Sequence, residues 1–281
     1  MVFTFPPIRA CLFDMDGLLL DTEDLYTKCA NIVLAKYGRP SLPWHVKAQL
    51  MGIPGGSNGD TLHAWAQLPI SREQFRDEQA EQQRIHFLHC APLPGVEKLL
   101  EDLKGARNAD GHKVEVALAT SSVRETFDMK TGGEGELAAR KRNLFQMIPE
   151  ERRILGDDRR VGKGRGKPFP DIYLLALKSI NDTLAEGEPR ITPEECLVFE
   201  DSVLGVEAGR RAGMRVVWVP HPGLLNVYKG REGEVLAGRS GMLTHIGHEE
   251  QLGQIGDGWA EMLESLEDFP YERYGIVVSA T

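Results

Sequence analysis

Two carboxylates that could do chemistry follow a short apolar run near the amino terminus. The run Cys11-Leu12-Phe13 leads directly into Asp14-Met15-Asp16-Gly17. A short apolar run closed by a turn residue is typical of a buried strand, and open α/β sheets bind ligands at the carboxyl ends of their strands. Two like charges this close cost free energy unless a proton or a cation lies between them, and Mg²⁺ prefers such oxygen ligands. Gly17 lets the backbone turn sharply after the pair.

Three further groups of polar residues stand at predicted strand ends or in a loop. Thr120-Ser121-Ser122 and Glu200-Asp201 each follow an apolar run, and Lys167 ends a basic, glycine-rich loop. The carboxyl ends of parallel strands meet at one edge of a sheet. We therefore expect all three groups to converge on the two aspartates, although they are far apart in the sequence.

Phosphoryl transfer is the chemistry that fits this combination. Asp14 can attack phosphorus and form an aspartyl-phosphate, provided that positive charge offsets its repulsion of the phosphate. Mg²⁺ held by Asp14, Glu200 and Asp201 is predicted to supply part of that charge, and the Lys167 ammonium the rest. Asp16 is then free to protonate the leaving alkoxide and later to deprotonate the attacking water.

The phosphate group itself needs hydrogen-bond donors. The Thr120 hydroxyl is predicted to bond a phosphate oxygen, and the backbone amides that follow it can add donors. We place Gly17, Ser121 and Ser122 in this phosphate-binding set.

Each of these groups also has a purely structural alternative. The aspartate pair could cap backbone amides, and Thr120-Ser121-Ser122 could cap the helix that follows. Lys167 could be an ordinary solvated lysine, and Glu200-Asp201 could act on the dipole of the next helix. The order of all four groups and their position at strand ends favour the chemical interpretation.

The elements that must position these residues suggest two units. Strands alternate with helices from residue 95 to 219, which predicts an α/β fold with a parallel sheet and helices on both faces. The segment between the first strand and its partner is predicted to be helical, with a glycine-rich loop over 52–59. We therefore predict a core domain of residues 1–21 and 94–281 and an inserted helical cap of residues 22–93.

Two later segments have less distinct patterns. The stretch 131–141 is polar and contains glycines, so we predict a surface insertion there, extending to about residue 143. Residues 258–266 are predicted to form a helix.

Composition sets the class of partner. The chain has 281 residues, 41% of them hydrophobic and 27% charged, and a net charge of −9. This balance argues against nucleic acid, which requires a basic face, but leaves small anions open. The amino-terminal stretch has no long apolar signal-peptide region, and no run is long enough to span a membrane. A cytoplasmic protein is expected. The oligomeric state is not set by the sequence, and a monomer is the expectation.

Four ordered motifs resemble those of the haloacid dehalogenase-like superfamily. They are Phe13–Gly17 (DxDG), Ala119–Ser122, Lys167–Tyr173 and Phe199–Ser202. The resemblance implies a flavodoxin-like (Rossmann-like) core with a helical cap placed just after the first motif. It also implies a nucleophile at Asp14, an acid/base at Asp16, and Mg²⁺ on Asp14, the Asp16 carbonyl and Asp201.

Within the superfamily the chain looks most like the pseudouridine-5'-phosphatase group and its fungal relatives. The shared stretches are 50–52, 94–99, 127–131, 155–158, 199–208 and 266–269. The resemblance implies a Mg²⁺-dependent phosphatase of a small phosphorylated metabolite, nucleotide-like or sugar phosphate, with pseudouridine 5'-phosphate as one candidate. The departures are the loop 52–59, the insertion after Thr131 and the stretch 105–113. The loop is where such enzymes are expected to select substrates.

Two other functions remain open. A phosphosugar mutase resembles this pattern but carries an arginine in the cap loop, where this chain has Ile53-Pro54-Gly55-Gly56. The absence of a basic side chain there favours hydrolysis, although Lys47, Arg72 or Arg76 could replace it. A catalytically silent binding or regulatory protein on the same fold is the other alternative.

Overall fold

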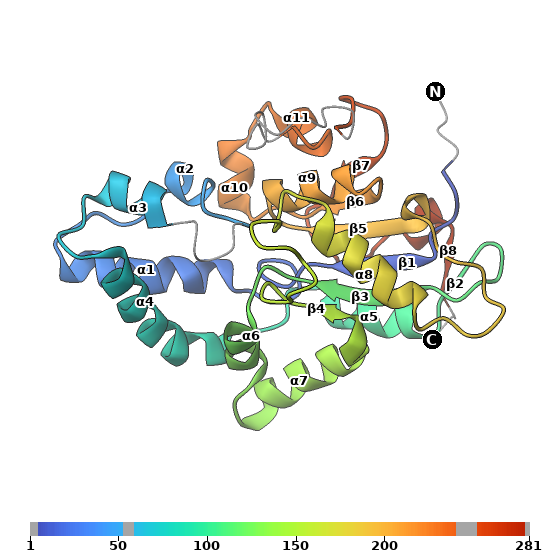
Figure 1. The fold of residues 1–281 in the computed structure, drawn as a ribbon, viewed down its shortest axis with the longest axis horizontal. Helices are drawn as coiled ribbons and strands as arrows, with labels where there is room; N and C mark the ends of the chain where they lie inside the picture. Colours follow the sequence, from blue (N-terminus) through green and yellow to red (C-terminus); the bar gives the residue numbers. More distant parts are fainter. Residues whose placement is uncertain (1–4, 53–58, 240–251, 279–281) are drawn as a thin grey trace.

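A parallel sheet of six strands forms the centre of the computed structural model, which describes residues 5–52, 59–239 and 252–278 (Figure 1). The strand order is β4-β3-β1-β5-β6-β7, and every pairing is parallel. The strands are β1 (Ala10–Phe13), β3 (Glu115–Ala119), β4 (Arg153–Ile154), β5 (Cys196–Glu200), β6 (Arg215–Trp218) and β7 (Ala260–Met262). A small antiparallel pair joins β2 (Arg107–Asn108) to β8 (Ile276–Val277). The predicted α/β class is confirmed.

Helices cover both faces of this sheet. One buried apolar cluster joins the sheet to α5 (Val96–Lys104), α6 (Arg124–Thr131) and α7 (Gly135–Gln146). The cluster on the other face joins it to α8 (Asp171–Asn181), α9 (Val203–Arg211), α10 (Pro222–Val227) and α11 (Glu232–Leu236). Short 3₁₀ helices lie at Phe87–His89, Glu150–Arg152, Pro193–Glu195 and Tyr271–Tyr274.

Strand β1 has a continuous apolar sequence because both of its faces are buried. Cys11 and Phe13 belong to the cluster on one face, while Ala10 and Leu12 belong to the cluster on the other. The Phe13 ring stacks on Phe199 of β5, with 4.5 Å between the ring centroids. This packing fixes the carboxyl end of β1, where the DxDG motif begins.

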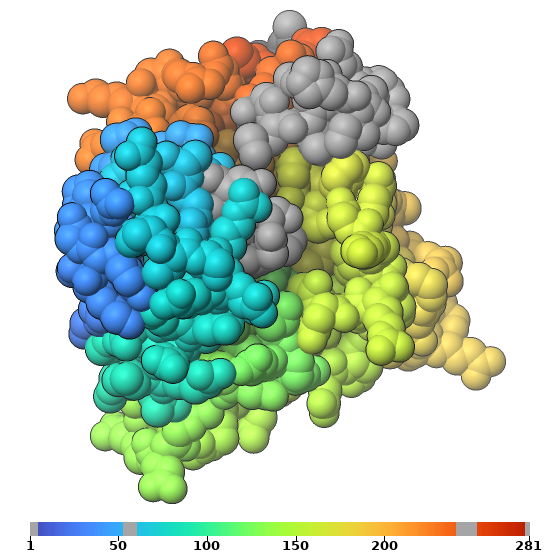
Figure 2. Space-filling model, turned by 60° about the vertical axis from the view of Figure 1, so that its left-hand side comes forward, coloured from blue at the N-terminus to red at the C-terminus, as the bar shows by residue number. Residues whose placement is uncertain are grey.

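Among the described residues, four α-helices lie in the segment between β1 and α5. They are α1 (Glu23–Lys36), α2 (Trp44–Lys47), α3 (Gly59–Ala66) and α4 (Arg72–His86). Ala30, Val33, Leu62 and Phe75 form a small apolar cluster of their own within this segment. Figure 2 shows the segment, blue to teal, on one side of the molecule, beside α10 in orange and α6–α7 in green. The domain boundaries at 22 and 93 stay a prediction.

The structure contradicts two of the predictions for local elements. Residues 135–146, largely within the predicted surface insertion, form helix α7, with Ala138, Lys141, Leu144 and Phe145 buried along one stripe. The prediction stopped short of Leu144 and Phe145, which complete the helical spacing. The predicted helix over 258–266 is also wrong, because Ala260–Met262 adds strand β7 to the edge of β6.

We expect Phe13→Ala to lower the free energy of unfolding by about 3–5 kcal/mol, because it leaves a cavity between β1 and β5. Leu174→Ala is the control, since Leu174 lies on α8 with 41% of its surface exposed. That change is expected to stay within about 0.5 kcal/mol. Urea denaturation measures both, and equal losses in the two variants would contradict the central position of β1.

Candidate active site

Asp14, the first residue after β1, lies in an almost dry environment at the carboxyl edge of the sheet. The residue is 5% exposed, and its Oδ1 atom accepts a hydrogen bond of 2.5 Å from Lys167 Nζ. Its backbone N–H donates to the carbonyl of Phe199, 3.0 Å away, which continues the β1–β5 ladder by one residue. Asp14 and Lys167, which are 153 positions apart in the sequence, are therefore in direct contact.

Glu200, at the end of β5, holds the other side of the same lysine. Lys167 Nζ and the Tyr173 hydroxyl each donate to Glu200 Oε1, both at 2.5 Å. The backbone N–H and the hydroxyl of Ser202 donate to Glu200 Oε2 at 3.2 and 3.0 Å. Both Glu200 oxygens therefore have protein partners.

Asp14, Glu200 and Asp201 form an acidic cluster, with one carboxylate oxygen of each lying within 4.8 Å of the others. All three side chains are buried, and Lys167 supplies a single positive charge. Asp201 Oδ2 is buried and has no hydrogen-bond partner among the described residues. Because a buried carboxylate oxygen normally has a partner, and hard cations prefer oxygen ligands, this donor set fits Mg²⁺.

Gly17, in the loop after β1, lies close to this cluster. Its φ is +69°, and a Cβ atom there would lie 2.3 Å from Asp201 Oδ2. A side chain at this position would therefore fill the space beside the unpartnered oxygen. Gly17 N–H donates to the Leu20 carbonyl at 2.9 Å and to Thr22 Oγ1 at 3.1 Å.

Electrostatics in the cluster disfavour three separate negative charges. Burial raises the pKa of Asp14 to about 7, an effect that Lys167 opposes and Glu200 reinforces. Burial also raises the pKa of Asp201 well above its usual value, with Glu23, Glu200 and Asp14 adding to the shift. A bound divalent cation would replace these protons.

The Asp16 side chain lies in a different set of contacts from that of Asp14. Its Oδ1 atom accepts hydrogen bonds from Thr22 Oγ1, at 2.8 Å, and from Lys130 Nζ. Its Oδ2 atom accepts one of 2.6 Å from Ser122 Oγ. Burial alone would raise the pKa of Asp16, but Lys130 and these hydroxyls lower it. Asp16 is therefore held as a carboxylate.

The three hydroxyl residues after β3 have different local partners. Thr120 is fully buried, and its Oγ1 atom accepts a 3.1 Å hydrogen bond from Ser122 N–H. The Ser121 hydroxyl donates to the carbonyl of Gly52, at 3.2 Å, at the start of the glycine-rich loop. The predicted phosphate-binding residues thus lie beside both Asp16 and the helical segment.

Comparison with known proteins identifies the family. The family model described as haloacid dehalogenase-like hydrolase matches residues 11–219. The chain belongs to this family.

Two curated relatives of this haloacid dehalogenase-like chain have phosphatase names. The probable pseudouridine-5'-phosphatase of Saccharomyces cerevisiae is 37% identical over 96% of this chain and 98% of its own length. The probable pseudouridine-5'-phosphatase of Drosophila melanogaster is 37% identical over 82% of this chain and 89% of its own length. A provisionally assigned β-phosphoglucomutase from Thermotoga maritima has a similar crystal structure, with a TM-score of 0.52 and 30% identity over 78% of this chain and 91% of that one.

These matches confirm the predicted class of enzyme for this family member, a hydrolase of phosphoric monoesters. They also confirm the resemblance to the pseudouridine-5'-phosphatase group and its fungal members. In the part of the chain that the structure describes, no helix combines the length and apolar character needed to cross a bilayer.

Lys130 is a residue of this haloacid dehalogenase-like site to which the sequence analysis gave no role. It lies on α6 and is fully buried against Asp16. The available signal was its spacing: Lys130 comes three residues after the buried Phe127, on a helix that starts next to the carboxyl edge of the sheet. A lysine on the apolar stripe of such a helix points inward and needs a partner there.

The residues of the helical segment that were considered for a second phosphate are only partly described. Ile53–Gly56 lies outside the described residues. Lys47 is buried, and its Nζ atom is paired with Glu23 Oε2 at 2.9 Å. Arg76 forms ion pairs with Glu73 and Asp77 on the surface of α4. Lys47 therefore already has an anionic partner within the helical segment.

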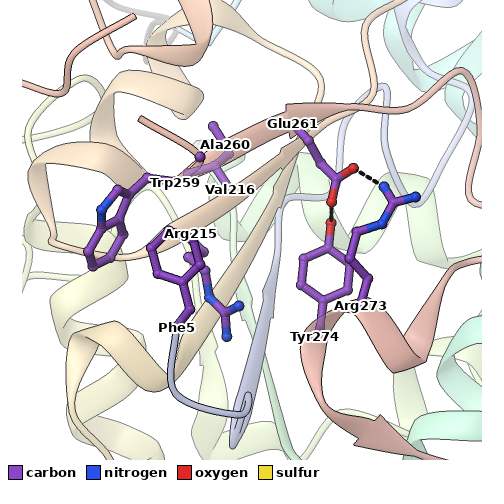
Figure 3. A pocket seen from close by; sticks show the side chains of 9 residues that line it. Phe5, Arg215, Val216, Trp259, Ala260, Glu261, Arg273 and Tyr274 are labelled. Carbon is purple, nitrogen blue, oxygen red and sulfur yellow. Dashed lines mark hydrogen bonds and ion pairs between the residues drawn. The ribbon is translucent and has the colours of Figure 1, made fainter. Parts of the chain in front are cut away.

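A pocket of about 240 Å³ lies at the other end of the strands in this family member, beside the first residues of β6 and β7 (Figure 3). Phe5, Arg215 and Trp259 line one part of it. In the other part, Glu261 accepts hydrogen bonds from Arg273 and from the Tyr274 hydroxyl. The carboxyl edge with Asp14 is thus a separate site.

We expect Mg²⁺ to stabilise the protein through the acidic cluster. At about 100 times its Kd the ion should contribute about 2.7 kcal/mol, seen as a rise in Tm. Asp201→Asn should remove most of this increment and raise the Tm of the metal-free protein, because one buried carboxylate is lost. Asp182→Asn, on a half-exposed surface aspartate, is the matched control and should keep the increment. An undiminished Mg²⁺ effect in Asp201→Asn would exclude Asp201 as a ligand.

Proposed function

We propose that the protein is a Mg²⁺-dependent phosphatase that works through an aspartyl-phosphate on Asp14. The observation that carries the proposal is the position of the Asp14 carboxylate. It is paired with Lys167 and lies in one acidic cluster with Glu200 and Asp201. A carboxylate at this edge of a parallel sheet is accessible to a ligand bound there. Lys167 supplies positive charge beside it, and a bound Mg²⁺ would supply more.

In the first step, a carboxylate oxygen of Asp14 attacks the phosphorus of the substrate. A bond forms between that oxygen and phosphorus, and the bond from phosphorus to the leaving oxygen breaks. Lys167 neutralises charge on the transferred group, and the Thr120 hydroxyl with the amide of Ser121 contributes hydrogen bonds. Bound Mg²⁺ supplies further positive charge against the phosphate oxygens.

In the second step, water attacks the phosphorus of the aspartyl-phosphate. Asp16 takes a proton from that water, inorganic phosphate leaves, and the Asp14 carboxylate is restored. Asp16 rests in the ionised form that this step requires. The first step needs a protonated Asp16, and a phosphate monoester can bring that proton because its second pKa is about 6.

The metal set we propose is Asp14, the backbone carbonyl of Asp16 and Asp201. Glu200 belongs to the same acidic cluster, but its oxygens accept four hydrogen bonds. We therefore propose that Glu200 mainly holds Lys167 in place, and that Asp201 with its unpartnered oxygen is the stronger metal ligand.

The substrate we propose is a small phosphorylated metabolite, nucleotide-like or sugar phosphate. Residues 22–93 would act as a cap that excludes bulk water. The two linkers of this segment support a paired hinge, because Asp21 N–H donates to the Ala91 carbonyl at 2.9 Å and Leu93 N–H to the Leu19 carbonyl at 3.2 Å. The names of the yeast and fly relatives make pseudouridine 5'-phosphate the first candidate. We propose a cytoplasmic enzyme.

A phosphosugar mutase is the second candidate, favoured by the crystal structure from Thermotoga maritima. A mutase transfers the phosphoryl group back to sugar, so a sugar bisphosphate would prime turnover without release of inorganic phosphate. A hydrolase releases phosphate from the same mixture. A silent binding protein would do neither.

We expect Asp14→Asn to lower phosphate release from 4-nitrophenyl phosphate by at least about 10³-fold, because the nucleophile is lost. Asp182→Asn makes the same chemical change on the surface and should retain full activity. Mass spectrometry after rapid quenching should find one phosphoryl group on the wild type and none on Asp14→Asn. Equal activity in the two variants would refute Asp14 as nucleophile.

A panel of phosphorylated metabolites then tests the substrate class. Pseudouridine 5'-phosphate, other nucleotides and sugar phosphates are compared by kcat/KM with Mg²⁺ present. We expect compact monoesters to be the fastest. Turnover that appears only when a sugar bisphosphate is added, with no free phosphate, would replace the phosphatase by the mutase.

A further inference from the structure

Lys130 is a charged residue beside the proposed site that has no exposed surface. Its side chain is fully buried on α6, which is rare for lysine. Its three N–H donors have three partners: Asp16 Oδ1, Ser122 Oγ at 2.7 Å and the Tyr26 hydroxyl at 2.8 Å. The ammonium also lies 4.8 Å from the centre of the Tyr26 ring and 5.1 Å from that of Phe87.

The lysine decides which groups donate and which accept in the hydrogen bonds around Asp16. An ammonium group can only donate, so the Ser122 oxygen accepts from Lys130 and its own hydrogen points to Asp16 Oδ2, 2.6 Å away. Thr22 Oγ1 likewise accepts from Gly17 N–H and donates to Asp16 Oδ1. Both carboxylate oxygens of Asp16 are therefore held from defined directions.

Three separate segments meet at this ammonium. Asp16 comes from the loop after β1, Ser122 from the loop after β3, and Tyr26 from α1 of the helical segment. Lys130 donates a hydrogen bond to a residue of each segment. Removing it would leave Asp16 with two hydroxyl donors and no adjacent cation.

We propose that Lys130 is a positioning residue that holds the Asp16 carboxylate in the orientation from which it exchanges a proton with the leaving oxygen. The inference rests on the proposed function and goes beyond it. Among the described residues, Lys130 makes no hydrogen bond to Asp14, Glu200 or Asp201, so it would act only through Asp16. Burial alone would lower the pKa of Lys130, but the neighbouring Asp16 carboxylate raises it, so the lysine stays charged beside Asp16.

The proposal predicts a dependence on the leaving group. When Asp14 attacks phosphorus, the leaving oxygen keeps the electron pair of the broken bond and takes the proton from Asp16. 4-Nitrophenolate delocalises its charge and leaves readily without a proton. Phenolate is more basic, with a conjugate acid of pKa about 10, and gains more from proton transfer. A misplaced Asp16 therefore slows phenyl phosphate more than 4-nitrophenyl phosphate.

The experiment compares kcat/KM for these two aryl phosphates, which have nearly the same shape. Their ratio does not depend on how much of a variant is folded, because both substrates meet the same molecules. We expect Lys130→Met to lower the ratio of phenyl to 4-nitrophenyl phosphate by at least about fivefold. Tyr26→Phe, which removes one acceptor of the ammonium, should shift the ratio the same way by less.

Lys141→Met is the matched control. Lys141 is also fully buried, on the neighbouring helix α7, but its Nζ atom donates to the Leu88 carbonyl at 3.0 Å, away from Asp16. Its loss should reduce stability and leave the ratio unchanged. In an Asp16→Asn background, Lys130→Met should not lower the ratio further, because Lys130 acts through Asp16.

The outcomes separate this inference from the proposed function. Equal losses on both substrates in Lys130→Met would overturn the positioning role and leave the phosphatase standing. If Lys130→Met does not fold, Tyr26→Phe decides, and an unchanged ratio there overturns the role as well. No phosphate release by the wild type from either ester would instead overturn the proposed function.

Discussion

The structure depends on burying like charges at one edge of a sheet. Asp14, Glu200 and Asp201 lie within reach of a single ion, and one ammonium, that of Lys167, faces them. Desolvated carboxylates this close repel each other strongly, so the site is stable only with protons or a cation between them. The surrounding backbone is shaped by this requirement. Gly17 leaves space beside Asp201, where any side chain would collide with its oxygen.

The residues around these charges are closely packed and hydrogen-bonded. A Cβ atom at Gly205 would lie 1.9 Å from the Glu200 carboxyl carbon, so the start of α9 can approach Glu200 only as glycine. Trp218 Nε1 donates to the Asp201 carbonyl at 2.8 Å, which ties that loop to β6. Ser202 caps α9 and also bonds Glu200. The same few contacts therefore end a strand, begin a helix and orient two carboxylates.

The sequence predicts this part well because parallel strands put their ends at one edge. Given the apolar runs, Asp14 and Asp201 could be assigned to the same edge of the sheet without knowing any contact. The sequence patterns predicted the wrong local structure where contacts with distant parts of the chain decide it. The stripe of α7 is completed only by Leu144 and Phe145, beyond the polar stretch. Residues 260–262 extend a sheet because β6 has a free edge there, which their own helix-like spacing does not indicate.

Lys130 could not be assigned from local sequence, because its environment is made by three segments that meet only in the fold. Its presence explains a difference between the two aspartates. Each has one lysine, but Lys167 shares its charge between Asp14 and Glu200, whereas the other partners of Lys130 are neutral hydroxyls. Burial therefore prevails at Asp14 and raises its pKa, while the undivided charge of Lys130 lowers that of Asp16. In the cation-free protein, two carboxylates two residues apart thus have opposite proton affinities, and a cation bound beside Asp14 would lower its pKa so that it could act as the ionised nucleophile.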